Sequence, residues 1–386
     1  MTGADRFLPF ALPDIGEREI EAVAEAMRSG WLTTGPQAAA FEQEFADFLG
    51  GGVHAIATNS ATAGLHLALE ALGVGPGDEV IVPTWTFTAT AEVVRYLGAE
   101  PVIVDIDPAT LNIALDAAAA AITPRTKAIM PVHFAGLAVD RRGLAKLADD
   151  RGLRVVEDAA HAFPTMSAGD LVGTGSSDAV VFSFYATKTM TTGEGGMVVT
   201  PDDGMAARIR TMRLHGINRD VFGRYQSTVP SWRYAVVAPG YKYNLTDPAA
   251  AMGRVQLRRS IEMRDKRTAI AAAYDEAFSG LPLRLPTHAT AGDAHAWHLY
   301  VVRLTDEAKL GRDAFIADMA ESGVGCSVHF IPLHMQPYWR EHCRLDDLQF
   351  PVATAEFERA VSLPIFSGMT PSQVDQVVET VRKALS

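Results

Sequence analysis

The chain has 386 residues, of which 48% are hydrophobic and 21% are charged, so it is long enough for about two domains with a sizeable buried core. Its 34 basic and 46 acidic residues give a formal charge of −12, which argues against a protein that binds duplex nucleic acid through clustered Lys and Arg. The only cysteines, Cys326 and Cys343, exclude a disulfide framework, and no stretch of about 20 apolar residues occurs, so we expect a cytoplasmic protein without a membrane segment or signal peptide.

Short β-branched runs alternate with helical patterns through the first two thirds of the chain. Strands are expected at residues 79–82, 102–105, 128–132, 154–157 and 179–182, and helices at 64–72, 89–97 and 141–150. The alternation of continuous apolar strands with helices predicts an α/β fold with a mostly parallel central sheet and helices on both faces. We assign this large domain to residues 15–250.

The remaining residues, 251–386, have a different pattern and are predicted to form a smaller C-terminal α+β domain. A long charged helix is expected from Pro248 to Phe278, and Gly280 and Pro282 then end it. Further elements follow as a strand at 299–303 and helices at 313–322 and 371–385. Residues 1–14 are expected to pack on this second domain.

Polar residues that follow two of the predicted strands suggest a binding site. Asp158 lies at one strand end, Ser183 at the next, and Lys188 five residues further on, before a Gly-rich return at 191–196. In open α/β sheets, ligands bind at the carboxyl ends of the strands. A lysine that can form a Schiff base and an aspartate that can pair with a pyridinium nitrogen are what pyridoxal phosphate chemistry requires. The lysine must also lose its proton, so its pKa must be lowered by burial or by nearby positive charge.

A phosphate group would need its own binding loop. Residues 58–64 form a small, hydroxyl-rich loop directly before an apolar helix, and backbone N–H groups at a helix start bind anions. Either Trp85 or Phe87, after the next strand, could stack on a cofactor ring.

Each of these residues also has an ordinary structural explanation. A single lysine at a strand end is usually solvated, and Asp158, Ser60 or Thr62 could each cap a helix. Trp85 and Phe87 could belong to the core, and the glycines at 193–196 could form a turn. The residues by themselves therefore allow two interpretations: a pyridoxal phosphate site, or a set of residues with unrelated structural roles.

Two histidine- and cysteine-containing spacings suggest a metal site, but only weakly. They are His295-x-x-His298 and Cys326-x-x-His329, without the paired CxxC or HExxH patterns of zinc proteins. We expect no metal. The densest basic run, residues 258–267, is interpreted as a solvated helix face with partners four residues away.

Three segments resemble the DegT/DnrJ/EryC1/StrS aminotransferases, which are fold-type-I pyridoxal phosphate enzymes that aminate keto groups of nucleotide-linked sugars. They are residues 156–162 (VEDAAHA), 182–188 (FSFYATK) and 192–197 (TGEGGM). The resemblance begins at residues 30–36 and extends through residues 131–136 to His329. Residues 239–247, 295–299 and 323–330 are most similar to the branch that makes 4-amino-4-deoxy-L-arabinose on UDP.

The resemblance implies a role for each matching residue. Lys188 would form the Schiff base, and Asp158 would pair with the pyridinium nitrogen. The remaining cofactor contacts would come from Ala61, Thr62 and Ser183 on the phosphate, Phe87 on the ring, and His161 beside the 3-hydroxyl group. Lys242 and Asn244 would reach the cofactor phosphate of the other subunit of a homodimer, and many relatives have different residues at these two positions. His329 and Trp31 would contact substrate, with Arg224 and Arg233 as nearby cations.

The resemblance also implies a reaction. Pyridoxal 5′-phosphate would alternate with pyridoxamine phosphate as L-glutamate donates its amino group to a nucleotide-linked 4-keto sugar, with a 4-ketopentose as one candidate. The Ala-, Arg- and Gly-rich composition suggests aminosugar biosynthesis in secondary metabolism. Amination at C3, a dehydratase and a non-enzymatic regulator remain alternatives within the family. Dehydratases have histidine in place of the lysine, whereas this chain has Lys188.

Overall fold

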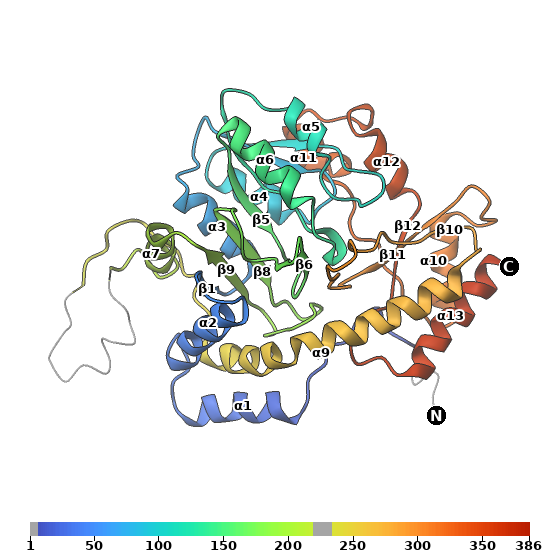
Figure 1. The fold of residues 1–386 in the computed structure, drawn as a ribbon, viewed down its shortest axis with the longest axis horizontal. Coiled ribbons are helices and arrows are strands. Elements are labelled where there is room, and N and C mark those ends of the chain that lie inside the picture. Colours follow the sequence, from blue (N-terminus) through green and yellow to red (C-terminus); the bar gives the residue numbers. More distant parts are fainter. Residues whose placement is uncertain (1–6, 219–233) are drawn as a thin grey trace.

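A computed structural model describes residues 7–218 and 234–386, and its main feature is a seven-stranded central sheet (Figure 1). In spatial order the strands are β1 (His54–Thr58), β9 (Gly196–Thr200), β8 (Ala179–Ser183), β5 (Arg154–Asp158), β4 (Thr126–Ile129), β2 (Glu79–Pro83) and β3 (Glu100–Val104). Only β9 runs against its neighbours, so the predicted mostly parallel sheet is confirmed. The carboxyl ends of the six parallel strands therefore share one edge, where β9 begins.

Helices cover both faces of this sheet, as the strand pattern predicted. One face is covered by α3 (Ala61–Ala71), α4 (Ala89–Tyr96) and α7 (Asp203–Met212). The other is covered by α2 (Pro36–Phe48), α5 (Leu115–Ala120), α6 (Arg141–Arg151) and the start of α9 (Asp247–Phe278). Val80 and Val82 pack on the first face and Ile81 on the second. This alternation explains why buried parallel strands are apolar at every position.

Two predicted elements differ from the structure by three residues at one end. Helix α3 begins three residues earlier than its apolar pattern, because Ser60 caps it by accepting a hydrogen bond from Ala63 N–H. Strand β4 ends at Ile129 rather than at residue 132, because Pro131 has no N–H to continue the ladder.

A second, smaller core lies around a three-stranded antiparallel sheet. This sheet contains β10 (Leu283–Arg284), β11 (Tyr300–Leu304) and β12 (Ala360–Leu363), and it packs with α10 (Arg312–Glu321), α13 (Pro371–Leu385) and the end of α9. Leu8 pairs with Val324 along the backbone, so residues near the N-terminus lie against this core. The sequence-based boundary at residue 250 falls in the first turn of α9, which runs without a break from one core to the other (Figure 1).

The remaining elements are short, apart from one helix. Helix α1 (Glu17–Arg28) packs along α9. The short elements are β6 (Met166–Ser167), β7 (Asp170–Leu171), η2 (Phe134–Gly136), η3 (Leu333–Met335), α11 (Pro337–His342), η4 (Asp347–Gln349) and α12 (Pro351–Phe357). Leu333 and Trp339 from this C-terminal group pack into the core of the central sheet, so the two cores are joined by more than α9.

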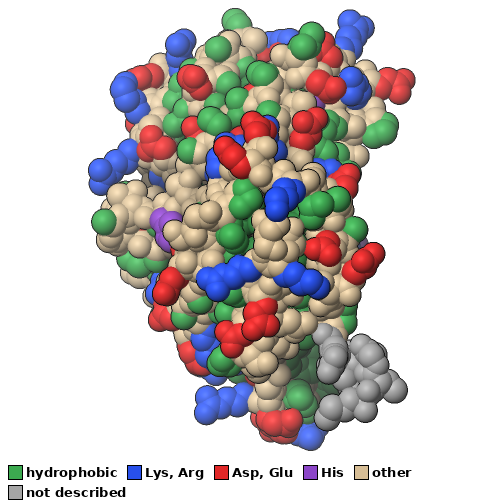
Figure 2. Space-filling view, turned by 90° about the vertical axis from the view of Figure 1, so that its right-hand side faces the viewer, with side chains coloured by type: hydrophobic (Ala, Val, Ile, Leu, Met, Phe, Trp, Pro, Cys, Tyr) green, Lys and Arg blue, Asp and Glu red, His purple; other side chains and the backbone are tan. Residues whose placement is uncertain are grey.

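Charged side chains of both signs are mixed on one face of the molecule. On the side of the small sheet and α13, Lys and Arg alternate with Asp and Glu (Figure 2). The basic run on α9 is paired within the chain: Arg258 with Glu44, Arg259 with Asp14 and Glu19, and Lys266 with Glu262. Within residues 7–218 and 234–386, no helix is long and apolar enough to span a bilayer.

Candidate active site

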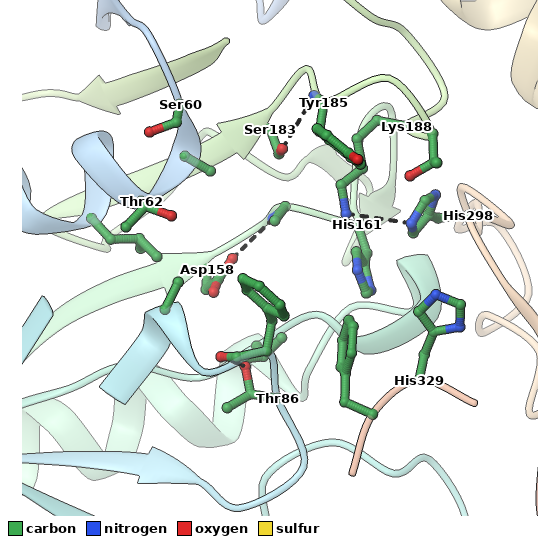
Figure 3. A pocket seen from close by; sticks show the side chains of 18 of the residues that line it. Ser60, Thr62, Thr86, Asp158, His161, Ser183, Tyr185, Lys188, His298 and His329 are labelled. Atoms are coloured by element: carbon green, nitrogen blue, oxygen red, sulfur yellow. Dashed lines mark hydrogen bonds between the residues drawn. The ribbon is translucent and has the colours of Figure 1, made fainter. Parts of the chain in front are cut away.

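A cavity of about 520 Å³ opens at the carboxyl edge of the central sheet. Residues from strand ends, from the start of α3 and from the small domain face it together (Figure 3). Ser60 and Thr62 lie at one end and His298 and His329 at the other, with Asp158 between them. Eight sequence-predicted residues line this cavity, namely Ala61, Thr62, Phe87, Asp158, His161, Ser183, Lys188 and His329.

The start of α3 forms the anion-binding end of the cavity. Ser60 caps Ala63 N–H, which leaves the N–H groups of Ala61 and Thr62 without a partner inside the helix. Gly196 makes this corner compact, since a Cβ there would lie 2.7 Å from Ala61 N. Two free N–H groups, the helix dipole and the hydroxyls of Thr62 and Ser183 together fit a phosphate group.

Asp158 lies at the floor of the cavity, and the residue is 5% exposed. Its Oδ2 accepts a hydrogen bond from Thr90 Oγ1 at 2.9 Å, and its Oδ1 accepts one from Ala160 N–H at 3.1 Å. Burial raises the pKa of Asp158, and these hydrogen bonds and the charge of Lys188 offset only part of that rise. None of the salt bridges among the described residues includes Asp158. A buried carboxylate without a paired cation fits the N–H of a pyridinium ring.

Lys188 is half-buried and faces the same space. Burial lowers the pKa of its amine to about 8, although the charge of Asp158 acts in the opposite direction. At pH 7, one unit below this pKa, about a tenth of Lys188 is therefore uncharged, and the uncharged amine is the form that acts as a nucleophile or base. Its Nζ lies 3.4 Å from Nε2 of His298, a residue with no role predicted from the sequence beyond the weak zinc spacing and the family-like segment 295–299.

His161 is neutral and has a defined tautomer. Its Nδ1 accepts a hydrogen bond from Ala135 N–H at 3.3 Å, so the ring proton must lie on Nε2. Burial, together with the charges of Lys188 and His329, lowers the pKa of His161 well below its usual value. The ring therefore offers an N–H donor, which suits an oxygen substituent on a bound cofactor.

Aromatic rings form the wall between the strand ends and the small domain. Phe87 is 57% exposed and lies 5.6 Å from Phe330, measured between ring centroids. Phe10 stacks on His329 at 5.0 Å. Trp85, the other aromatic considered for stacking, is fully buried and donates from Nε1 to the carbonyl of His329, so it belongs to the core.

Three predicted site residues lie outside this cavity in the single chain. The side chain of Asn244 donates to Thr34 Oγ1, and the carbonyl of Lys242 accepts from Asn59. The segment that contains both pairs with the end of β1, beside the phosphate-binding corner. Trp31 packs over Gly35 at the start of α2. Arg224 and Arg233 lie outside the described residues.

The residues without a predicted role that line or support the cavity include Phe10, Thr90, His298 and Phe330. Their partners are distant in the chain, although His298 and Phe330 lie in segments, 295–299 and 323–330, that carry the family resemblance. In the part of the chain that the structure describes, no group of three His, Cys, Asp or Glu side chains could hold a metal ion.

Comparison with known proteins places this geometry in a family. Residues 13–382 match the DegT/DnrJ/EryC1/StrS aminotransferase family. The chain is 45% identical over 381 residues to the spore coat polysaccharide biosynthesis protein SpsC of Bacillus subtilis (strain 168), covering 98% of this chain and 97% of SpsC.

Solved structures agree with this match. Spr1654 from Streptococcus pneumoniae, described as a sugar aminotransferase, has a TM-score of 0.92 in its PMP form at 34% identity, covering 98% of each chain. Its PLP form has a TM-score of 0.91. PseC from Helicobacter pylori, an aminotransferase involved in pseudoaminic acid biosynthesis, has a TM-score of 0.90 at 28% identity, covering 98% of this chain and 99% of PseC.

These comparisons confirm the fold-type-I architecture and bear out the expected cofactor, pyridoxal 5′-phosphate with a pyridoxamine intermediate. The family match covers both cores and every residue that lines the cavity except Phe10. The chain belongs to the DegT/DnrJ/EryC1/StrS aminotransferase family.

Proposed function

We propose that this protein is a sugar aminotransferase that transfers the amino group of L-glutamate to a nucleotide-linked 4-keto sugar. The observation that carries the proposal is the convergence of Lys188, Asp158 and the start of α3 on one cavity. The family match and the sugar aminotransferases among the structural neighbours support the reaction class. The likeness of residues 239–247 to the aminoarabinose branch makes a UDP-linked 4-ketopentose the first substrate to test.

Pyridoxal phosphate, when bound, supplies the aldehyde that receives the amino group and the ring that delocalises electrons from the reacting carbon. The side chains of this protein then have separate tasks. Lys188 uses its uncharged amine to take a proton from the donor carbon and to return a proton to the sugar carbon. Asp158 would keep the ring nitrogen protonated, because a nearby negative charge favours the charged, protonated form of that nitrogen.

The remaining residues hold the cofactor in register with Lys188. The N–H groups of Ala61 and Thr62, with the hydroxyl of Ser183, would bind the phosphate. Phe87 would pack on the ring face, and His161, whose Nδ1 is occupied by Ala135 N–H, would donate from Nε2–H to the 3-oxygen. These contacts fix the cofactor at both ends, so Lys188 reaches one defined atom.

The substrate and the second subunit complete the site in this proposal. His329 faces the cavity from the small domain, and burial lowers its pKa to about 4, so it contacts the sugar as a neutral ring. Trp31, in the loop before α2, contacts the sugar nucleotide. Lys242 and Asn244 act on the cofactor phosphate of the other subunit of a homodimer, which is consistent with their position outside the cavity of their own chain.

The alternatives within the family differ in one or two residues. A dehydratase would have histidine at position 188, and a regulator would lack the Lys188 and Asp158 pair. Amination at C3 rather than C4 uses the same residues, so only the product distinguishes it. A panel of UDP- and dTDP-linked keto sugars with L-glutamate, analysed by mass and NMR, identifies the aminated carbon. A product aminated at C3, or no product with any 4-keto sugar, contradicts the proposal.

Covalent attachment of the cofactor tests the role of Lys188. Borohydride reduction is expected to attach pyridoxal phosphate permanently to the wild-type protein but not to Lys188→Ala, and that variant should lose at least about 1,000-fold in turnover. Peptide mass analysis after denaturation locates the modified residue. Lys146→Ala is the matched control, because Lys146 is exposed and paired with Asp150. Equal retention of cofactor by wild type and Lys188→Ala would remove Lys188 from its role.

A further inference from the structure

His298 touches the reacting amine, although no step of the proposed reaction yet uses it. It precedes β11 in the small domain, whereas Lys188 follows β8 in the central sheet. Its Nε2 lies 3.4 Å from Lys188 Nζ, and the residue is only 6% exposed (Figure 3). The contact therefore joins the two cores at the point where the reaction occurs.

The backbone around His298 is held rigidly. Arg267, buried on α9, donates from its guanidinium to the carbonyls of Trp297 at 3.1 Å, His298 at 3.4 Å and Ile365 at 2.7 Å. Gly136 allows a close approach from the other side, since a Cβ there would lie 3.2 Å from His298 N. The ring of His161 packs against the ring of His298, with 4.3 Å between centroids. His298 therefore has little freedom to turn away from Lys188.

The two ring nitrogens of His298 have unequal surroundings. Nε2 faces Lys188, whereas Nδ1 is buried and has no hydrogen-bond partner among the described residues. An unpartnered buried N–H is rarer than an unpartnered acceptor, which favours a proton on Nε2. Burial and the nearby charge of Lys188 lower the pKa of His298 well below its usual value, so the ring is neutral and carries one proton.

The position of that proton discriminates between the two forms of Lys188. The uncharged amine has a lone pair that can accept a hydrogen bond from Nε2–H. The ammonium has only donors, so Nε2 would have to accept and the ring proton would have to move to the unpartnered Nδ1. We propose that His298 is a positioning residue that holds Lys188 as the uncharged amine, because its Nε2–H donates to that amine and its Nδ1 disfavours the opposite tautomer.

No other group around Lys188 is placed to hold its amine uncharged in the same way. Besides His298, the titratable and charged groups that line the cavity or lie behind it are Asp158, His161, Tyr185, Glu194, Arg267 and His329. Asp158 favours the ammonium form, and His161 also presents an N–H because its Nδ1 is occupied by Ala135. Among the described residues, His298 is the one with a hydrogen-bond contact to Lys188 Nζ.

The inference rests on the proposed role of Lys188, and it can be tested in the cofactor-free protein. Only the uncharged amine captures pyridoxal phosphate, so the rate of covalent capture against pH has a midpoint at the pKa of Lys188, expected at about 8. In His298→Gln and His298→Asn, an amide oxygen can accept from the ammonium without a tautomer penalty. The midpoint should rise by about one pH unit, and capture near pH 7 should slow by about tenfold and recover at high pH.

His295→Gln is the matched control, because His295 is buried in the same segment but stacks on Trp297 and does not line the cavity. Its midpoint should match wild type. A midpoint that is unchanged or lowered in both His298 variants overturns the inference, whereas failure of the wild type to capture the cofactor overturns the proposed function instead. Neutron diffraction from the wild-type protein needs no variant, and a hydrogen on Nδ1 rather than Nε2 of His298 also overturns the inference.

Discussion

Two neighbouring carboxylates at the end of β5 have opposite surroundings. Glu157 is fully buried on one face of the strand, where Nε2 of His133 lies 2.7 Å from its carboxylate and Arg141 and Ser177 complete its contacts. Burial alone would raise the pKa of Glu157, but the contact with His133 and the charge of Arg141 lower it to about 2. Asp158 lies on the other face with two hydrogen bonds and no paired cation, and its pKa is raised.

The difference separates a structural carboxylate from one that is available to a ligand. Glu157 has all its contacts within the chain, and one of them, His133, is held in place because its Nδ1 accepts a hydrogen bond from Val139 N–H. Asp158 has donors on both oxygens but its charge is not balanced, so a cationic ring nitrogen would stabilise it. Strand geometry produces this division, because successive side chains point to opposite faces of a sheet.

The largest effect on stability is expected at Glu157, the carboxylate that is paired within the chain. Glu157→Gln removes the charge from a buried ion pair and leaves Arg141 poorly compensated, so the free energy of unfolding should fall by about 3 kcal/mol. Chemical denaturation of the cofactor-free protein measures this change. Asp150→Asn, which breaks an exposed pair with Lys146, is the control and should cost less than about 1 kcal/mol.

The acid dependence of stability gives a second measurement on the same variant. Because the pKa of Glu157 is lowered from 4.5 to about 2, its contribution is present above pH 4.5 and is lost as the pH falls towards 2. Asp158 acts with the opposite sign, since its raised pKa means that protonation favours the folded state. In Glu157→Gln, the free energy of unfolding should therefore fall less steeply between pH 4.5 and pH 2 than in the wild type. An unchanged dependence on pH in this range would contradict the pairing of Glu157 with His133 and Arg141.

The next effect is expected on catalysis rather than on stability. Asp158→Asn should lower turnover by about 100-fold, because the ring nitrogen loses its anionic partner while Lys188 still captures the cofactor. The free energy of unfolding of the cofactor-free protein should not fall, since an amide costs less to bury than an unpaired carboxylate. Steady-state kinetics and denaturation of the same preparation provide both values.

Glu157→Gln serves as the comparison for the catalytic measurement. At a temperature where it remains folded, its capture of the cofactor by Lys188 should stay close to wild type. If Asp158→Asn turns over at the wild-type rate, Asp158 has no part in catalysis. If it instead destabilises the cofactor-free protein as much as Glu157→Gln does, the contrast between the two carboxylates is wrong.

Much of the fold could be predicted because local patterns and tertiary packing agree. Helix α13 was predicted at its observed bounds, since Thr370 caps it and Pro371 occupies its first turn. The expected helix at 141–150 and the long helix that ends at Phe278 differ from the structure by single residues. Alanines 117–120 lie within α5, in keeping with the high helix propensity of alanine, and Ala121 caps its end.

Part of the site could be predicted from the positions of its residues after the strands. Asp158, Ser183 and Lys188 each follow a strand, and the carboxyl ends of parallel strands meet at one edge, so their order along the chain already implied proximity. Arg267 shows where this reasoning fails. It lies in a run interpreted as a solvated helix face, yet it is buried and binds three backbone carbonyls from two other segments.

The sequence by itself determined the parallel sheet, the helices on its faces and the lysine and aspartate at its edge, because each depends on periodicity or on position after a strand. Only the tertiary structure decided what surrounds these two residues. Thr90 is 68 positions from Asp158, and His298 is 110 positions from Lys188. No local pattern records such contacts, since they arise where α4 and the small domain close over the strand ends, and they set the charge state on which the chemistry depends.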